Sequence, residues 1–520
     1  MQALAPAITD RAEAVRFLTQ TTFGASRSAI DELLAVGDPS DWIDAQMALP
    51  PSLTEPYTRA NSNGSLRTTR HYIWWENAMN GADQLRQRVA FALSEIFVIS
   101  DIDYVLGNSQ YAMCNYYDML ADEAFGNFRS LLERVTLHAC MGTYLSMVRN
   151  ERADPARNVR PDENYAREIL QLFTIGLYEL NPDGTVQTSG GVPIPSYDQE
   201  TVEQFAKTFT GWNYADTREW NSNRAYDRTL PMTAWQEYHD DTAKVLLNGT
   251  VLPAGQTAEA DLAGALDNIF AHPNVGPFIG RSLIRRLVTS NPTPAYVERV
   301  AAAFDNNGAG VRGDMAAVVR AILLDPEARS GHVTNPATFG KVKEPILRLT
   351  QLWHAFDAQP GPESGGIYRT RARVVDQIAD LFGQSILRSP SVFNFFNPDN
   401  PLSPTSDLVA PEMQILTEIN VATTDNMFFS QIYSHNSFYD APATQTRIQI
   451  SYEMSLAADI NALLDHLDEL LLAGSLPDQY RAVIADRLTV HDGSTEQGRA
   501  DRVLDAIYCI YASPFHYVQK

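Results

Sequence analysis

The sequence predicts a mainly α-helical protein, built from multi-helix, bundle-like lobes with one or two short β-hairpins. First, apolar residues recur through most of the 520 residues at the three- and four-residue spacing of amphipathic helices. Second, a stretch typical of a hairpin, rich in Gly, Pro, Thr and Ser, runs from about Asn181 to Pro195. Third, 44% of the residues are hydrophobic and 20% are charged, an ordinary globular composition that excludes disordered and collagen-like chains.

The helices of the first half are expected from this periodicity and from the residues that start and stop helices. In the stretch 162–176, Asp162 stands near the N-terminus and Gly176 provides the stop. The expected helices begin near Val15 and near Ile30 and then cover 84–100, 115–133, 136–148 and 162–176.

The second half returns to helical periodicity after an irregular stretch with interspersed Trp, Tyr, Asn and Pro. Its expected helices cover 258–270, 276–289, 294–305, 313–325, 341–356, 411–430, 452–472 and 476–488, with a last one ending near Ala512. Domains commonly hold about 100–200 residues. We therefore expect an N-terminal helical lobe with the candidate polar site, an irregular aromatic-rich connection and a C-terminal helical lobe, over residues 1–212, 213–256 and 257–520.

Acidic residues outnumber basic ones by 63 to 40, which gives a formal net charge of −23. A field of this sign repels phosphate backbones and anionic lipid, so we expect no nucleic-acid partner. No stretch approaches the roughly 18 uninterrupted apolar residues of a transmembrane helix, so we expect no membrane span.

The N-terminus lacks the basic and apolar regions of a secretory signal, so the chain as written is expected to be cytoplasmic. The alternative is an exported protein whose signal has been removed. The three cysteines, Cys114, Cys140 and Cys509, are widely spaced in apolar or aromatic stretches, which indicates free buried thiols.

Glu95 is the first candidate site residue. It lies in the segment 90–99, which is apolar on every side apart from Ser94 and Glu95, and such helices are normally buried. A carboxylate carried into a core must be paired, metal-bound or protonated. The structural alternative is that Glu95 caps a helix or bridges neighbouring helices through an arginine.

Polar residues in 161–176 give the second candidate. Glu163 and Arg167 lie four residues apart and can pair along a helix. Asn164, Glu168 and Gln171 form a separate polar line among apolar neighbours. That line suits metal ligation or general acid–base chemistry, and it suits an interhelical hydrogen-bond network equally well.

His138, in a mostly apolar segment, is the third candidate, and a satisfied core histidine is its structural alternative. Together with Glu95, Glu163 and Glu168 it resembles the carboxylate and imidazole sets of helical metal sites, but without their Glu-x-x-His spacing. The pattern therefore identifies neither a metal nor a cofactor.

Motifs of the common enzyme classes give no further assignment. GxxxxGK[ST], GxGxxG, GxSxG and HExxH do not occur in context. Arg281, Arg285 and Arg286 form a basic helix face, for which pairing with acidic neighbours and an anion-binding pocket are the two interpretations.

Several segments together resemble a large uncharacterised bacterial family, catalogued as domain of unknown function 1800. They are 16–24, 85–89, 161–176, 209–212, 272–275, 339–345, 389–396 and 411–412. The resemblance implies a helical bacterial protein without an established activity. Members often carry an export signal and are often encoded beside a sulfatase-like protein, which implies such a partner and an extracytoplasmic setting.

The chain departs from its relatives at four positions. Many relatives place two histidines in the helix matching 85–97 and a Glu-x-His in the segment matching 171–173. The residues at these positions here are Ser94, Ile96, Gln171 and Phe173. If the relatives' histidines bind metal, this chain keeps only the carboxylates of that set.

Three functions follow as hypotheses. The first is an enzyme, hydrolytic in its suggested form, with Glu95 or Glu168 as acid–base group and Arg167 binding an anionic group in a pocket completed by His138 and Glu163. The second is a non-catalytic binding or maturation partner of the sulfatase-like protein, with an exposed apolar patch near 213–240. The third is carbohydrate binding by the aromatic residues of that segment.

Overall fold

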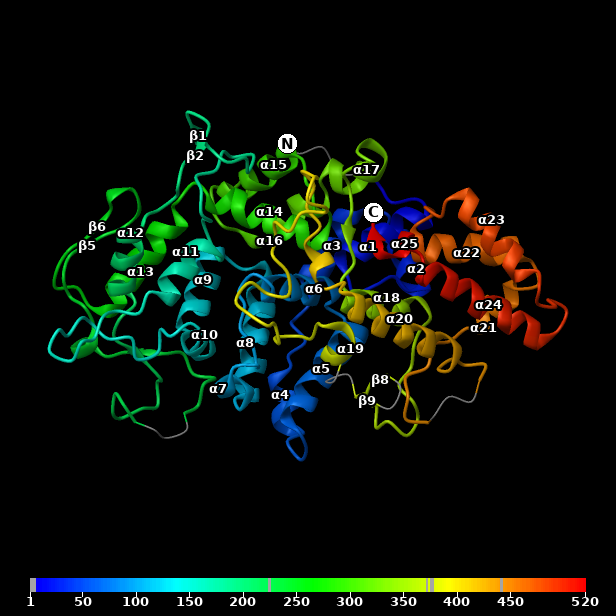
Figure 1. The fold of residues 1–520 in the computed structure, drawn as a ribbon, viewed down its shortest axis with the longest axis horizontal. Coiled ribbons are helices and arrows are strands. Elements are labelled where there is room, and N and C mark those ends of the chain that lie inside the picture. The colour runs from blue at the N-terminus through cyan, green and yellow to red at the C-terminus, as the bar shows by residue number, and fades with distance from the viewer. Residues whose placement is uncertain (1–5, 223–225, 371–372, 375–377, 440–442) are drawn as a thin grey trace.

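The computed structural model describes residues 6–222, 226–370, 373–374, 378–439 and 443–520. It confirms the mainly α-helical prediction, since helices dominate and the strands form only short two-stranded antiparallel pairs (Figure 1). None of the helices in the described part of the chain is both long and apolar enough to cross a bilayer.

The helices of the first 210 residues come close to those expected from periodicity. They are α1 (Arg11–Thr21), α2 (Arg27–Val36), α3 (Pro39–Met47), α4 (Glu55–Ala60), α5 (Leu66–Asn80), α6 (Gln84–Ser94), α7 (Tyr104–Gly107), α8 (Gln110–Asp122), α9 (Phe128–Leu137), α10 (Ala139–Tyr144), α11 (Asn164–Gln171) and α12 (Gln199–Thr208). Side chains of Asp10, Ser26 and Ser65 cap the first turns of α1, α2 and α5.

The helices after residue 257 build the rest of the fold. They are α13 (Ala258–Phe270), α14 (Val275–Leu287), α15 (Pro294–Asp305), α16 (Met315–Leu323), α17 (Pro326–Thr334), α18 (Pro345–Ala355), α19 (Ala379–Phe382), α20 (Glu418–Tyr433), α21 (Ser451–Leu456), α22 (Ile460–Leu472), α23 (Asp478–Leu488), α24 (Glu496–Tyr511) and α25 (Pro514–Tyr517).

Short strand pairs and 3-10 turns join these helices. The strand pairs are β1 (Thr188–Ser189) with β2 (Val192–Pro193), β3 (Trp212–Asn213) with β4 (Thr233–Ala234), β5 (Lys244–Val245) with β6 (Val251–Leu252), β7 (Lys341–Val342) with β10 (Val518–Gln519), and β8 (Arg369–Thr370) with β9 (Arg373–Val374). The 3-10 turns are η1 (Glu123–Phe125), η2 (Gln236–Tyr238), η3 (Leu247–Gly249) and η5 (Pro411–Gln414). The β1–β2 pair confirms the hairpin expected between 181 and 195.

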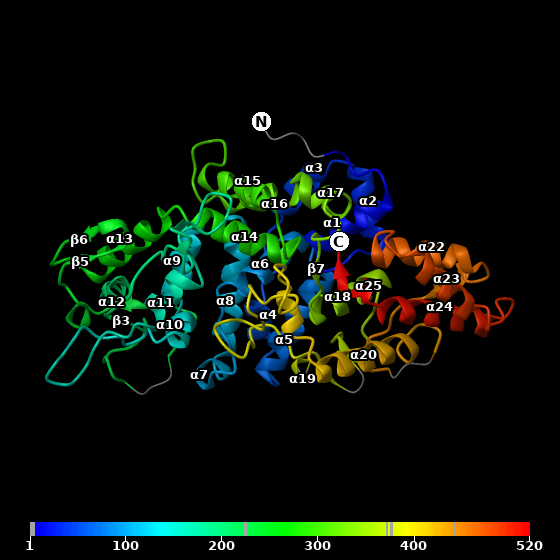
Figure 2. The same ribbon diagram turned by 45° about the horizontal axis from the view of Figure 1, so that its top comes forward.

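Helix α6 lies at the centre of an elongated molecule. It packs against α1, α3, α5, α8 and α14, and every one of its residues from Leu85 to Ser94 is buried. In both views α12 and α13 lie near one end of the long axis and α22 to α24 near the other (Figures 1 and 2). The lobe boundaries at 212 and 256 stay predictions.

Several expected helices end earlier or break, among them the one expected over 115–133, which is divided between α8 and α9. The helix expected over 84–100 ends at Ser94, and Ile96–Ile99 stay buried in an irregular turn. The helix expected over 136–148 is two helices that meet at His138, which has extended backbone angles (φ −69°, ψ 126°). The stretch 452–472 divides between α21 and α22, because Asp459 adopts an extended backbone and caps α22.

Candidate active site

A cavity of about 480 Å³ opens beside the C-terminal end of α6. Its walls come from the end of α6, from the turn after α11, from α14 and from the segment 392–399, which are far apart in the sequence. Hydrophobic side chains dominate the lining, and the polar residues on it are Glu95, Gln171, Arg281, Ser282, Arg286, Asn397 and Asp399. A mostly apolar cavity of this size with a few convergent polar groups is typical of small-molecule sites.

Glu95 is placed on this wall by the way α6 ends. Its backbone N–H donates to the carbonyls of Ala92 and Leu93, which closes the last turn. Its own carbonyl accepts from Arg286 Nη2 (2.9 Å), so a cation from α14 satisfies the C-terminus of α6. The Glu95 side chain is 4% exposed, and Asn394 Nδ2 donates to its Oε1 (3.3 Å).

The carboxyl group of Glu95 is paired with a second one, that of Glu344, which precedes α18. Burial, with the neighbouring charge of Glu344, raises the pKa of Glu95 well above its ordinary value. Burial also opposes ionisation of Glu344, but Lys341 and the hydrogen bond from Glu95 lower its pKa. We therefore interpret the pair as sharing one proton that lies mainly on Glu95, as expected when two carboxyl groups meet in a protein interior.

Four further charged side chains and one amide complete a buried cluster around this pair. Lys341 Nζ lies 3.5 Å from Glu344 Oε1 and 3.2 Å from Glu412 Oε1. Gln384 Nε2 donates to Glu344 Oε2 (2.5 Å). The charges of Arg88 and Arg286 also act on the two carboxyl groups.

We call these residues the central cluster: Arg88, Glu95, Arg286, Lys341, Glu344 and Glu412. All six side chains are buried, so their charges interact without the screening of bulk water. Among them, Glu95 and Arg286 also line the cavity.

Two of the other predicted site residues form an exposed pair elsewhere. Arg167 Nη2 donates to Glu163 Oε2 (2.9 Å), which confirms the pairing expected from their four-residue spacing. Gln199 on α12 bonds to both side chains. Glu163 and Arg167 do not line the cavity that holds Glu95.

Glu168 lies on the inner face of α11, one turn before Gln171. Burial raises its pKa, and its Oε2 accepts no hydrogen bond from any residue that the structure describes. Gln171 reaches the cavity whereas Glu168 is not among its lining residues.

His138 has a structural task at the junction of α9 and α10. Its Nδ1 accepts from the N–H of Cys140 (3.1 Å), which caps α10, and its Nε2 donates to Asn115 Oδ1 (3.1 Å). Burial, with Arg134 nearby, lowers its pKa to about 3, so the ring is neutral at physiological pH. It faces a separate cavity of about 570 Å³ together with Asp118.

The structure thus does not bring the five predicted residues into one pocket. Of these five residues, only Glu95 lines the cavity beside α6. The missed residues, Lys341, Glu344 and Glu412, come from segments that carried the family resemblance, which was the one signal in the sequence that could have found them. On the basic face of α14, pairing with an acidic neighbour is confirmed for Arg285, whereas the anion-binding interpretation stays a prediction. Arg285 pairs with Asp399 (2.8 Å), whereas Arg281 lines the cavity.

Two of the four positions at which the chain departs from the relatives that it resembles meet in this cavity. Ile96 and Gln171 both line it, while Ser94 and Glu95 border a much smaller cavity on the other side of the same turn. Within the described residues, no three His, Cys, Asp or Glu side chains are arranged to hold a metal ion.

The aromatic segment 213–240 does not form the expected exposed patch. Trp212, Tyr214, Trp220 and Tyr226 are buried, and Trp235 is half-buried. Trp220 stacks on Tyr238 with ring centroids 4.1 Å apart, so these rings pack on one another rather than on a ligand. The expectation was wrong because aromatic side chains supply the core that this poorly periodic segment otherwise lacks.

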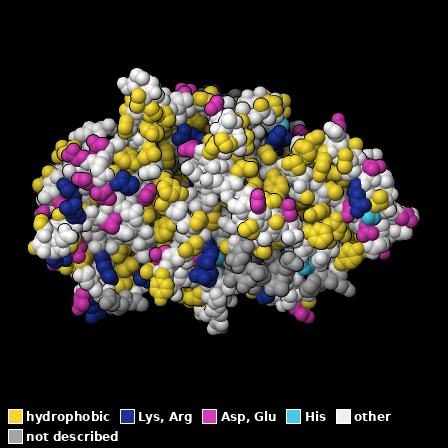
Figure 3. Space-filling model, in the orientation of Figure 1, with side chains coloured by type: hydrophobic (Ala, Val, Ile, Leu, Met, Phe, Trp, Pro, Cys, Tyr) yellow, Lys and Arg dark blue, Asp and Glu magenta, His cyan; other side chains and the backbone are white. Residues whose placement is uncertain are grey.

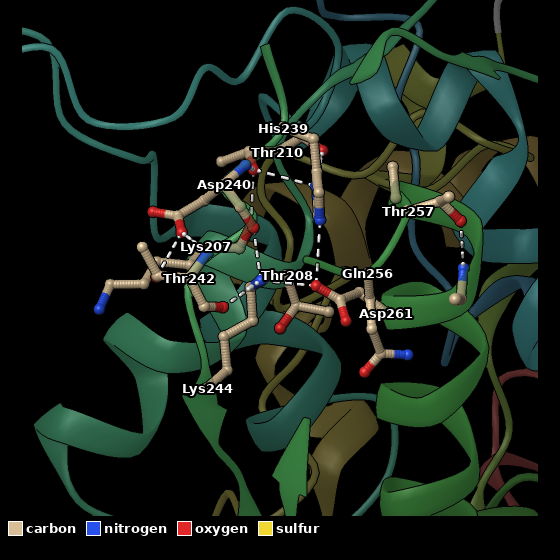
Figure 4. Close-up of polar contacts among 12 residues, drawn as sticks. Lys207, Thr208, Thr210, His239, Asp240, Thr242, Lys244, Gln256, Thr257 and Asp261 are labelled. Atoms are coloured by element: carbon tan, nitrogen blue, oxygen red, sulfur yellow. Dashed lines mark hydrogen bonds and ion pairs between the residues drawn. The ribbon is translucent and has the colours of Figure 1, made fainter. Parts of the chain in front are cut away.

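A second buried charged cluster anchors the same segment. Lys244 Nζ (2.5 Å) and His239 Nε2 (3.0 Å) both bond to Asp261 Oδ2 on α13, and all three side chains are fully buried. Figure 4 shows the lysine and histidine converging on the aspartate. Because all three side chains are fully buried and bond to one another, we interpret this cluster as structural.

The three cysteines are free thiols, two of them buried, as the sequence indicated.

Comparison with known proteins identifies a family and nothing more specific. The chain matches none of the curated proteins and none of the solved structures. A family model described as "Protein of unknown function (DUF1800)" matches residues 16–518, nearly the whole chain. The match therefore extends beyond the last resembling segment, 411–412, through the C-terminal helices, and the chain belongs to the DUF1800 family.

Proposed function

We propose that the chain is an enzyme whose active site is the cavity beside α6 and whose proton donor is Glu95. The observation that carries this proposal is a buried carboxyl group, with a raised pKa and a second carboxyl group beside it, on the wall of a ligand-sized cavity. Raised carboxyl pKa values in clefts are typical of general acids, because a neutral carboxyl can donate a proton at physiological pH.

The central cluster supports a full acid–base cycle. Glu344, held by Lys341 and Gln384, accepts the hydrogen bond of Glu95 and stabilises its protonated state. Arg286 lies beside Glu95, with its Nε 3.7 Å from Glu95 Oε2, and it offsets the negative charge that appears when Glu95 gives up its proton.

The reaction that we propose is hydrolysis. Glu95 gives its proton to the leaving oxygen as the bond to that oxygen breaks, and water supplies a hydroxyl group to the cleaved centre. The remaining proton of the water then returns to the Glu95 carboxylate, so that atoms and charge balance.

A panel of chromogenic substrates tests this proposal. The 4-nitrophenyl acetate, butyrate, phosphate, sulfate and glucoside are incubated with the wild-type chain and with Glu95→Gln. A positioned general acid contributes about 10²–10⁴-fold, so we expect one class to be cleaved and the variant to lose at least 100-fold in kcat while remaining folded. No cleavage above the buffer rate by the wild-type chain, or equal rates for both proteins, would contradict it.

The sulfatase-like partner and an exported setting remain a second proposal. The observation that favours a partner is a set of exposed apolar side chains around the β1–β2 hairpin, among them Val192, which is 67% exposed. Affinity purification of the tagged chain, from cells that also express the sulfatase-like protein encoded beside it, tests the proposed partnership. Recovery of the chain without that protein would contradict it.

A further inference from the structure

Arg281 on α14 is a cation on the cavity wall without an ion pair among the described residues. Its guanidinium donates from Nη1 to the carbonyl of Gly184 (3.1 Å), and no carboxylate of the described residues lies within ion-pairing distance of it. The two neighbouring arginines differ, since Arg285 pairs with Asp399 and Arg286 lies against Glu95. Burial, with the charge of Arg285, lowers the pKa of Arg281, and the charge of Asp399 opposes this shift.

Arg281 gives this wall a positive charge that no ion pair among the described residues offsets. Arg286 faces the carboxyl groups of Glu95, Glu344 and Glu412, and Asp399 pairs with Arg285. A cavity that carries an arginine without an ion pair, in a chain of net charge −23, favours an anion, because the rest of the surface repels one.

The mouth of the cavity is apolar. Leu177, Tyr178 and Val186 on one side and Phe393 on the other line it, and they are 48%, 42%, 39% and 49% exposed. Phe278 lies deeper, against the α-carbon of Gly176, whose φ of 73° brings the chain back toward α14. Figure 3 shows hydrophobic side chains gathered below the tip of the β1–β2 hairpin, next to basic side chains over α14.

We propose that the cavity binds a small amphipathic anion, with one carboxylate or phosphate group at Arg281 and an aromatic or short aliphatic body against Phe278 and Phe393. A volume of about 480 Å³ admits such a molecule and excludes a folded macromolecule. The choice of this cavity as the binding site rests on the proposed function, whereas the chemical class of the ligand is inferred from Arg281 and the apolar mouth.

Calorimetric titration with three small probes tests this inference. The probes are phenyl phosphate, phenylacetate and the uncharged benzyl alcohol, and the proteins are the wild-type chain, Arg281→Gln and Arg499→Gln. Arg499 is the matched control, because it also donates only to backbone carbonyls but lies on the remote helix α24.

We expect at least one anionic probe to bind and the uncharged probe to bind at least ten-fold more weakly. Loss of a hydrogen bond to a charged group weakens binding by about 10- to 100-fold, so Arg281→Gln is expected to lose that much and Arg499→Gln nothing. The preferred anion, phosphate or carboxylate, identifies the ligand class.

Absence of binding by both anions, equal binding of benzyl alcohol, or an unaffected Arg281→Gln would each overturn the inference. Glu95→Gln separates this inference from the proposed function, since it is expected to bind the anion and fail to cleave. Anion binding without any cleavage in the chromogenic panel would support the ligand class and contradict the enzyme. Cleavage of neutral esters without anion binding would support the enzyme and contradict the ligand class.

Discussion

Replacing each carboxyl group of the Glu95–Glu344 pair by an amide is expected to have very different consequences for stability. Glu344→Gln removes the negative charge that Lys341 faces at 3.5 Å and the acceptor for the shared proton. The cations Lys341, Arg88 and Arg286 stay buried, and Glu412 remains as the acid next to Lys341. Breaking a buried ion pair by removing one partner costs about 3–5 kcal/mol.

Glu95→Gln is expected to be mild because glutamine resembles the protonated carboxyl group. Its Nε2 can donate to Glu344 in place of the shared proton, and its Oε1 can still accept from Asn394. We expect a change in stability of at most about 1 kcal/mol at pH 5.

The pH dependence of stability is expected to differ between the wild-type chain and Glu95→Gln. Because the pKa of Glu95 is raised in the folded chain, the folded state keeps a proton that the unfolded state releases as the pH rises past 4.5. The stability linked to Glu95 is therefore fully present below that pH and is lost as the pH rises. Glu95→Gln lacks this loss, so its stability relative to that of the wild-type chain should increase between pH 5 and pH 8.

Differential scanning fluorimetry from pH 5 to pH 8 checks both variants. An unfolding entropy of about 2.1 cal/mol/K per residue gives about 1.1 kcal/mol/K for the whole chain if it unfolds as one unit. Glu344→Gln should therefore lower Tm by about 3–5 °C. Equal losses in the two variants, or a Glu344→Gln variant as stable as the wild-type chain, would refute the shared-proton pair.

Three further predictions concern positions away from the cavity. Asp261→Asn leaves Lys244 buried without its carboxylate and should cost about 3–5 kcal/mol, with faster hydrogen exchange over 239–252; unchanged exchange there would contradict an anchoring role. Because the pKa of His138 is lowered in the folded chain, the folded state loses stability as the pH falls below about 6.5. His138→Asn keeps a capping side chain and should make the decline of Tm between pH 6.5 and pH 4.5 less steep. An equally steep decline in the variant would count against this role of His138. Gly211→Ala should lower stability by about 1–3 kcal/mol, because φ is 83° and the added Cβ would lie 2.9 Å from the backbone nitrogen of His239; an unchanged Tm would contradict this.

The sequence predicts the helical fold well because amphipathic periodicity is a local property. The helices α13 and α15 begin and end at the expected residues, and the pairing of Glu163 with Arg167 follows from spacing alone. Helix α6 is the instructive exception. Its apolar sequence continues past Ser94, and what ends the helix is the tertiary bond from Arg286 to the carbonyl of Glu95.

The candidate site was predictable only in part. Glu95 could be identified because a carboxylate among apolar residues is unusual within one segment. Glu344 could not, since with Lys341 and Lys343 it belongs to a charged stretch at the start of the helix expected over 341–356, where charged side chains are normally exposed. Its burial depends on β7 pairing with β10 and on contact with Glu95, which are long-range contacts that leave no local pattern.

The proposed role of Glu95 as proton donor requires that its carboxyl group is protonated, and infrared difference spectroscopy measures this protonation state directly. Spectra of the wild-type chain and of Glu95→Gln are recorded at pH 7, and their difference isolates the vibrations of this one side chain. The shared-proton pair predicts the carbonyl stretch of a protonated carboxylic acid in the wild-type chain that is missing from the variant. A difference spectrum with only carboxylate bands would show that Glu95 is ionised and would contradict its role as proton donor.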